Sequence, residues 1–129
     1  MAEEQLPNSP EAEKGMAGAM ISDPVHIAAY VERFGATANV CHDLRTQIVC
    51  DTLAKMSEQG KPIDLITLDI QIKQDGFGKQ VTTGFLAELQ DSCPTPAMFD
   101  HFCEIVEEKA HLRAVIRTGS EIVAEAKQS

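Results

Sequence analysis

Cysteine and histidine are the residue types in this chain that could act as nucleophiles or bind a metal. The four cysteines are Cys41, Cys50, Cys93 and Cys103. Cys41 is followed directly by His42, but adjacent residues do not face each other on a helix, and no third residue can be named that would orient a base. The cysteine pairs, at spacings of nine and ten residues, could converge on zinc with His42 or His101. Because no C-x-x-C motif is present, we favour small apolar residues in a reducing compartment, with no metal and no disulfide.

Carboxylates are the next candidates for chemistry. Asp64 lies in an apolar segment and could be a buried acid with a functional pKa, but we favour a role in accepting backbone hydrogen bonds in the turn before a helix. The glutamates Glu104, Glu107 and Glu108 lie beside Lys109, which is typical of a solvated charged helix face. Neither set predicts an active site.

A nucleotide-binding P-loop requires G-x-x-x-x-G-K followed by Ser or Thr. The Gly-Lys pairs of the chain, Gly60-Lys61 and Gly78-Lys79, are followed by proline and glutamine. The motif is therefore absent. We predict that this chain is not an enzyme by itself and that it binds no cofactor.

Composition limits the possible partners. The chain has 129 residues, 43% of them hydrophobic, and a formal net charge of −9 with scattered basic residues. Phosphate binding depends on clustered Lys and Arg, so we expect little direct binding to DNA and contacts with proteins instead. No apolar run approaches the roughly 18 residues of a membrane span, and the N-terminus is acidic where a signal peptide would be basic. We expect a cytoplasmic protein that does not enter the membrane.

Capping residues and helix breakers divide the chain into about six helices, which predicts an all-α fold. The expected helices are one from Pro10 capped by Ser9, one from Asp23-Pro24 to Phe34 stopped by Gly35, one over about 42–59, one over about 68–74 capped by Thr67, one over 85–91 capped by Thr83, and one from Ala97 to about Lys127 after Thr95 and Pro96. We expect a flexible tail over 1–8 and a single domain over 9–129, with a globular head at 9–96 and a long helix at 97–129.

Two helices carry further packing expectations. In the third, the residues expected on the buried side are Leu44, Ile48, Val49, Thr52, Leu53 and Met56. In the first, Gly15 and Gly18 would each cost about 1 kcal/mol of helix stability relative to Ala, which suggests that another backbone approaches closely.

The last helix is too long for the head. Thirty residues at 1.5 Å each span roughly 45 Å, more than the width of a domain of this size, so part of the helix must project as an assembly arm. Its apolar residues recur at helical spacing and need cover from this chain or another. We predict a self-association surface made of Phe102, Ile105, Val106, Leu112, Ile116 and Val123, with Arg113 and Arg117 as its polar rim. The half up to Val106 is expected to be core, so residues beyond about Lys109 are the better interface candidates.

Four short motifs occur in an order and at a spacing that resemble a known family. They are Pro10-Glu11-Ala12-Glu13 with Gly18, then Gly60-Lys61-Pro62-Ile63-Asp64-Leu65-Ile66-Thr67-Leu68, then Phe85-Leu86-Ala87-Glu88-Leu89, then Ile105-Val106-Glu107-Glu108-Lys109 with Leu112-Arg113. The chain resembles the N-terminal domain of replicative DnaB-type DNA helicases from about residue 6 to 126.

This resemblance implies an all-helical head followed by the first arm of a helical hairpin. In that family, hairpins pair between subunits and build a collar, a trimer of dimers above a hexameric ring of ATPase domains, and primase docks on the collar. The resemblance thus implies a non-catalytic domain acting in DNA replication. Its expected partners are further copies of itself, a primase or helicase loader, and the helicase ATPase domain if the chain is part of a longer protein.

The chain also departs from the family pattern. Cys41-His42 stands where a Phe-Tyr pair is usual, Thr46-Gln47 replaces His-Arg, and Cys50 replaces an aromatic residue, so we expect a divergent member, from a phage or mobile element. The sequence ends before the second hairpin arm and the ATPase domain that the resemblance implies. We therefore expect either a fragment of a longer helicase or a free-standing relative. The alternative function is a standalone regulator that binds a replication protein.

Overall fold

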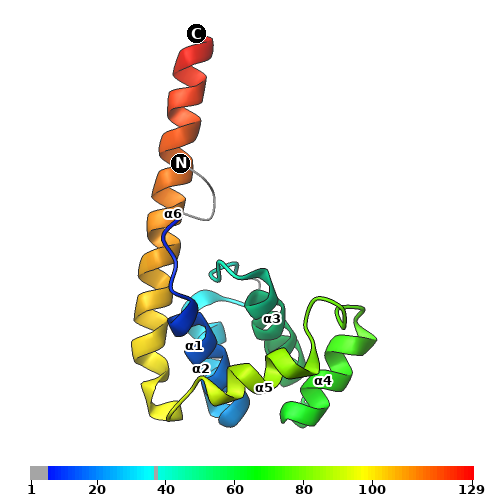
Figure 1. Cartoon of the computed structure of the whole chain (residues 1–129). Coiled ribbons are helices and arrows are strands. Elements are labelled where there is room, and N and C mark those ends of the chain that lie inside the picture. Colours follow the sequence, from blue (N-terminus) through cyan, green and yellow to red (C-terminus); the bar gives the residue numbers. More distant parts are fainter. Residues whose placement is uncertain (1–5, 37) are drawn as a thin grey trace.

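The computed structural model describes residues 6–36 and 38–129 and, over these residues, contains helices and no strand. The elements are α1 (Pro10–Ser22), α2 (Val25–Phe34), α3 (Leu44–Glu58), α4 (Leu65–Gln74), α5 (Thr83–Asp91), the short 3₁₀ helix η2 (Pro96–Met98) and α6 (Phe99–Gln128). The predicted all-α fold with a long C-terminal helix is confirmed. Figure 1 shows α1 to α5 gathered into a head, from which α6 extends. The first five residues of the expected tail lie outside the described part.

Helix α1 is the centre of the head, and it packs against α2, α3, α5, η2 and α6. Its predicted cap is confirmed, because the Ser9 side chain accepts a hydrogen bond from the Ala12 N–H at 3.2 Å. Residues on all sides of α1 are buried: Ala12, Glu13, Gly15, Met16, Ala17, Gly18, Ala19, Met20 and Ile21. A helix that is buried all round needs neighbours on every face, so α1 determines where the other helices lie.

The two glycines of α1 mark its closest contacts. A Cβ atom on Gly18 would collide with the backbone carbonyl oxygen of Leu89 in α5, so the expected close approach of another backbone is confirmed there. A Cβ atom on Gly15 would lie 2.6 Å from the ring of Phe102 in α6, so the close neighbour at that position is an aromatic side chain. These contacts place α5 and α6 directly against α1.

Several helix starts differ from the predicted ones. Helix α4 begins at Leu65, three residues earlier than expected, because Asp64 and not Thr67 is its N-cap. Helix α5 begins at Thr83, and Thr82 is the cap, with its hydroxyl oxygen accepting from the Phe85 N–H at 3.1 Å. In both places two neighbouring residues could serve as caps, and the sequence alone does not choose between them.

The third helix is shorter than predicted, and its predicted buried side is confirmed except at Leu44. The confirmed residues are Val49, Thr52, Leu53 and Met56, which are buried, and Ile48, which is half-buried. The helix runs from Leu44 to Glu58 after an Asp43 cap, and Leu44, expected on the buried side, is 69% exposed. Leu44 and the fully buried Leu53 are nine residues apart, which places them about 180° apart around the helix. The buried face is therefore centred near Leu53, and Leu44 points to solvent.

Helix α6 contains 30 residues and is therefore about 45 Å long. Its first half lies along the head, and its second half extends beyond it (Figure 1). The predicted projecting helix is thus present, although it is preceded by the 3₁₀ turn η2 and begins at Phe99 and not at Ala97. Among the described helices, none combines the length and the apolar character needed to cross a membrane.

Gly18 provides a test of the contact between α1 and α5. We expect Gly18→Ala to lower the free energy of unfolding by about 1–3 kcal/mol, because the added methyl group must push the two helices apart. Gly84→Ala in α5 is the control, since a Cβ atom there would meet only the Thr82 hydroxyl, at 3.9 Å, and Ala favours helix. Urea unfolding followed by circular dichroism measures both, and equal stability of the two variants would contradict this packing.

Candidate functional site

The two halves of α6 have different surroundings. The buried residues of the helix are Phe99, Cys103, Val106 and Arg113, which face the head. After Arg113, Ile116 is half-buried, and the rest of the helix is exposed. We call residues 114–128 the arm. Because the described residues of the head leave the arm exposed except at Ile116, most of its surface is open to contacts with other molecules.

One face of the arm is apolar. Val115 is 54% exposed, Ile122 is 61% exposed and Val123 is 53% exposed, and Leu112 lies just before them on the same side. Residues 112, 115, 119, 122 and 126 follow one another in steps of three and four, the spacing of a helix seam that packs against other helices. Gly119 and Ala126 occupy two of these positions, and such small residues allow a neighbouring helix to come close. We call this surface the apolar stripe; it begins with Leu112, just before the arm, and its members are Leu112, Val115, Ile116, Gly119, Ile122, Val123 and Ala126.

The residues predicted for the interface fall into two groups. Val106 is buried, and Phe102 and Ile105 are half-buried against the core, so these three help to attach α6 to the head. Leu112, Ile116 and Val123 belong to the apolar stripe. Sequence reasoning missed Val115 and Ile122, which are more exposed than Leu112. The alternation of three and four residues from Leu112 onward could have revealed them.

Arg113 is not at the rim of an exposed surface, as the sequence suggested, but is 3% exposed. Its guanidinium group donates hydrogen bonds to the backbone carbonyl oxygens of Pro7, at 2.9 Å, and Val40, at 2.8 Å. Burial lowers the pKa of Arg113, and the negative charge of Glu13 opposes this shift. The contact with Pro7 also attaches part of the expected tail to α6. Arg117, the other predicted rim residue, is exposed.

Glu13 completes the polar junction at the base of the arm. Its buried carboxylate accepts hydrogen bonds from the backbone N–H groups of His42, at 2.8 Å, and Asp43, at 3.0 Å. It thereby holds the segment that leads into α3, while Arg113 holds the same segment at Val40. We call this group, Glu13 and Arg113 with residues 40–43, the junction.

The cysteines lie in environments that do not favour reaction. Cys41, Cys50 and Cys103 are buried, and all four thiols are free. Hydrogen bonding to Cys50 and burial raise the pKa of the Cys41 thiol, and burial raises the pKa of Cys103 to about 12, so both remain protonated at neutral pH. The side chain of His42 is exposed. Across the described residues, no group of three or more His, Cys, Asp or Glu side chains is placed to hold a metal.

Asp64 has the structural role that the sequence favoured. Its carboxylate accepts the Thr67 N–H at 2.8 Å, and the Thr67 hydroxyl accepts the Asp64 N–H at 2.9 Å, which forms a capping box. The hydrogen bond from the Thr67 backbone lowers the pKa of Asp64 below its ordinary value. Asp64 is exposed, so it is a helix cap and not a buried acid.

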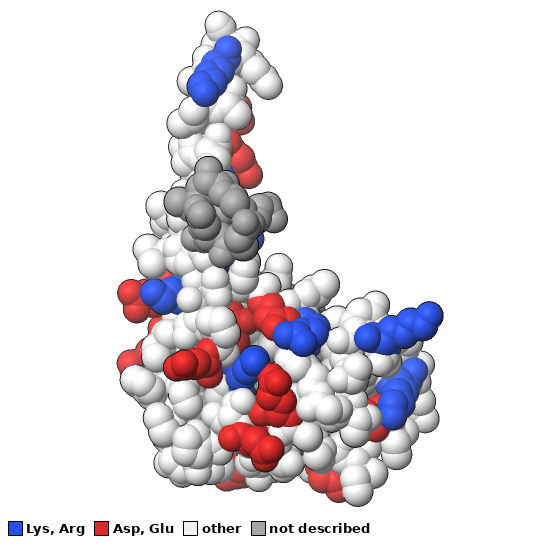
Figure 2. Space-filling model, in the orientation of Figure 1, with Lys and Arg blue, Asp and Glu red and all other residues white. Residues whose placement is uncertain are grey.

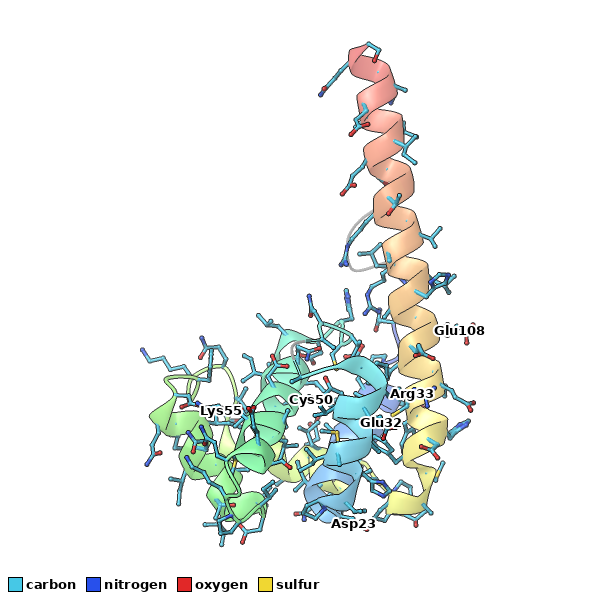
Figure 3. All side chains as sticks on the ribbon, turned by 180° about the vertical axis from the view of Figure 1, so that it is seen from behind. Asp23, Glu32, Arg33, Cys50, Lys55 and Glu108 are labelled. Atoms are coloured by element: carbon cyan, nitrogen blue, oxygen red, sulfur yellow. The ribbon has the colours of Figure 1, made fainter. Side chains whose placement is uncertain are left out.

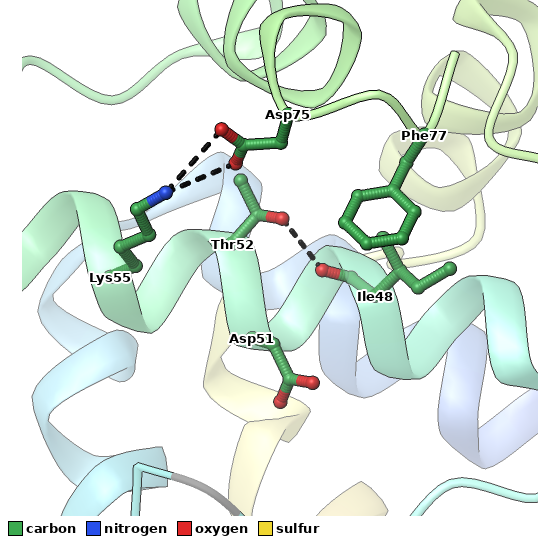
Figure 4. Close-up of a pocket in the computed structure, with 6 residues that line it drawn as sticks. All are labelled: Ile48, Asp51, Thr52, Lys55, Asp75 and Phe77. Carbon is green, nitrogen blue, oxygen red and sulfur yellow. Dashed lines mark hydrogen bonds and ion pairs between the residues drawn. The ribbon is translucent and has the colours of Figure 1, made fainter.

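A pocket of about 380 Å³ lies between α3 and the loop after α4 (Figure 4). Its lining residues are Ile48, Asp51, Thr52, Lys55, Asp75 and Phe77. Lys55 is paired with Asp75 at 3.3 Å, and burial raises the pKa of Asp51 while a hydrogen bond from Gln47 opposes the shift. The pocket contains neither a histidine nor a cysteine, and its lysine is already paired. This arrangement supports no reaction that we can name.

Charges on the surface are intermixed. Figure 2 shows acidic and basic side chains interspersed over the head on the face in view, without a continuous basic surface. Twenty acidic residues stand against eleven basic ones in the whole chain. The charge distribution therefore offers no strong attraction for a phosphate backbone on that face.

A helical head with one helix that extends far beyond it defines the class of this protein: an all-α domain with a projecting helical arm. The family model described as the DnaB-like helicase N terminal domain matches residues 5–108. The chain belongs to this family, as the resemblance of its motifs predicted.

Similar proteins agree with this assignment. The chain is 29% identical over 117 residues to "Replicative DNA helicase DnaB" of Geobacillus stearothermophilus, covering 90% of this chain and 25% of that protein. It is 30% identical over 117 residues to the protein of the same name from Haemophilus influenzae, again covering 90% of this chain and 25% of the relative. The chain thus spans about a quarter of the length of the curated relatives it matches.

A solved structure shows the same fold. The crystal structure of the N-terminal domain of DnaB helicase from Mycobacterium tuberculosis matches with a TM-score of 0.89 at 26% identity. The match covers 95% of this chain and 88% of that one. The projecting helix is therefore included in the shared fold.

Arg113 and Arg117 form a matched pair for testing the junction. We expect Arg113→Gln to lower the free energy of unfolding by about 1–3 kcal/mol, because two partly buried carbonyl oxygens lose a charged donor whose own side chain is buried. Arg117→Gln, one helical turn further on and exposed, should change it by less than about 0.5 kcal/mol. Chemical unfolding measures both, and similar losses in the two variants would refute a structural role for Arg113.

The cap of α4 can be tested by pH. A carboxylate with a lowered pKa in the folded state stabilises the fold above its ordinary pKa, and this stability is lost as the pH falls through the folded value. We expect the thermal midpoint of Asp64→Asn to fall less steeply than that of the wild type between about pH 5 and pH 3, because asparagine caps without titrating. Asp91→Asn, at an exposed carboxylate, is the control and should follow the wild type. Parallel curves for the wild type and Asp64→Asn would contradict the shift.

Proposed function

We propose that this chain is the non-catalytic collar domain of a replicative DNA helicase, where it mediates self-association and docks a primase or helicase loader. In this proposal an ATP-dependent helicase domain, outside this chain, performs the unwinding. The observation that carries the proposal is the apolar stripe on an arm that the head leaves uncovered. The family assignment supports it, because the relatives are named replicative DNA helicases.

The energy of burying the stripe suits reversible association. Four large aliphatic residues of the stripe are exposed, namely Leu112, Val115, Ile122 and Val123. Because each is about half exposed, burying them on two arms would contribute on the order of 10 kcal/mol. This is similar to the roughly 4–15 kcal/mol that association costs. We therefore expect self-association that depends on concentration.

The width of the stripe indicates the kind of contact. A two-stranded coiled coil needs apolar residues at two positions of each heptad. Here Ile116 and Val123 add a third apolar row beside the seam of Leu112, Val115 and Ile122. A stripe of this width is typical of a helix in a bundle of several helices. It thus supports packing of the arm among other hairpin helices, as the family resemblance implies.

Ile122 and Ala124 allow a matched test of the arm. We expect Ile122→Glu to weaken self-association at least about tenfold, because a charge would replace a buried aliphatic side chain. Ile116→Glu should act in the same direction. Ala124→Glu adds the same charge about 200° around the helix from Ile122 and should leave the association unchanged. Light scattering over a concentration series measures the mass, and circular dichroism checks that each variant stays helical.

Two results would contradict this proposal. A wild-type chain that remains monomeric at the highest concentration would show that the arm does not mediate association of this chain. Equal effects of Ile122→Glu and Ala124→Glu would show that negative charge, and not the apolar stripe, weakens the contact. Unfolding of Ile116→Glu would be a separate result: it would show that Ile116 stabilises the fold and is not part of the association surface.

A further inference from the structure

A second surface lies on the head, away from the arm. A groove of about 450 Å³ runs between α2 and the C-terminal half of α3. It is lined by Ala28, Val31, Glu32, Ala36, Ala54, Ser57 and Glu58. Its lining is mostly small and Ala54 is buried, so none of the lining residues in the described part of the chain fills the space with a large side chain. Figure 3 shows α3, α2 and α6 side by side in this order, which places the groove on the side of α2 away from α6.

The groove has an acidic rim. Glu32 on α2 and Glu58 on α3 are both exposed, and neither forms an ion pair within the described residues. The nearest bases in sequence are turned elsewhere: Arg33 pairs with Glu107 at 3.3 Å, Lys55 pairs with Asp75 at 3.3 Å, and Lys61 donates to Gln71 at 2.8 Å. The described residues thus leave two carboxylates beside this groove without a cation paired to either of them.

The dimensions of the groove suit a helix. One wall of the groove begins at Ala28 on α2 and ends at Ala36, just past the end of that helix. The other wall covers about one turn of α3, from Ala54 to Glu58. About two turns of a helix, roughly 11 Å, fit along such walls. An alanine-lined surface allows a helix to approach closely, and carboxylates at the edges attract basic residues that flank its apolar face.

We propose that the groove between α2 and α3 binds an amphipathic helix of another protein, whose small aliphatic face is flanked by Lys or Arg residues. A second copy of this chain and a nucleic acid are both negatively charged. The acidic rim and the net charge of −9 would repel either of them, so both are disfavoured as occupants of the groove. This inference deepens the docking part of the proposed function and does not depend on the arm. Because the groove lies on the head and the apolar stripe lies on α6, a basic partner could bind the groove while the arm is associated with other copies.

The test uses a synthetic probe. The probe is an amphipathic peptide of about five helical turns with an Ala/Leu face and flanking lysines, and its counterpart carries glutamates in place of the lysines. Both are titrated into the Ile122→Glu chain, so that failure of self-association and failure of the groove are observed separately. Fluorescence anisotropy measures binding, and amide NMR shifts locate it. We expect saturable binding of the basic peptide with shifts in α2 and α3, and no binding of the acidic one.

Matched variants separate the groove from general electrostatics. Glu32→Lys with Glu58→Lys should weaken binding at least about tenfold, whereas Glu104→Lys with Glu108→Lys, the same charge change on α6, should weaken it less than about threefold. Ala28→Trp fills the groove from an exposed position and should abolish binding, and Val25→Trp on the same helix should not.

Four outcomes would overturn this inference. The first three are equal losses in the two charge-reversed pairs, shifts that fall on the arm, and no saturable binding of the basic peptide. Shifts of the groove amides that depend on protein concentration alone would show that a second copy fills it, which would also overturn the proposal.

Discussion

The structure depends on how closely α1 is approached by its neighbours. Gly18 lets the backbone of α5 touch α1, and Gly15 leaves room for the ring of Phe102 from α6. Because α1 is buried on all sides, a change in these distances would affect the helices that pack on it, α2, α3, α5 and α6. The direction of α6, and with it the position of the arm, is a consequence of packing around one short helix.

Polar groups fix the segment between α2 and α3 in the same region. The Gln47 side-chain oxygen accepts the N–H groups of Val40 and Cys41, both at 2.9 Å, and its nitrogen donates to the Ala38 carbonyl at 2.8 Å. The junction holds the same segment from α1 and α6. Side chains from three helices therefore satisfy the backbone of an irregular segment at the base of the arm. A base that is held in this way keeps the arm in one direction, and a preorganised arm would lose less conformational entropy in the association that we propose.

Local signals in the sequence predicted the helices well, because caps, prolines and glycines act within a few residues. Ser9 and Gly35 bound helices as expected, and the long apolar period of α6 was sufficient to predict a projecting helix. Some errors are local, such as the choice between neighbouring caps at α4 and α5. The larger errors concern contacts that are distant in the sequence. The sequence predicts Arg113 at the surface, because its hydrogen-bond partners Pro7 and Val40 are 106 and 73 residues away along the chain. Nothing near Glu13 in the sequence indicates that it caps a segment 30 residues later. The groove depends on how α2 and α3 pack against each other. The spacing of apolar residues within each helix does not predict this arrangement.

The chemistry of the two proposed surfaces follows from the charge of the chain. Each copy carries a net charge of −9, so two copies repel each other at long range, and the association that we propose would have to rest on burial of the apolar stripe. The same charge favours the approach of a basic partner, and the rim of Glu32 and Glu58 gives that attraction a place on the head. Added salt screens the repulsion in the first case and the attraction in the second, so it acts on the two contacts in opposite directions. The two proposed contacts depend on different physical forces, apolar burial at the stripe and electrostatic attraction at the groove. One acidic domain could therefore bind its own copies and a different protein at separate surfaces.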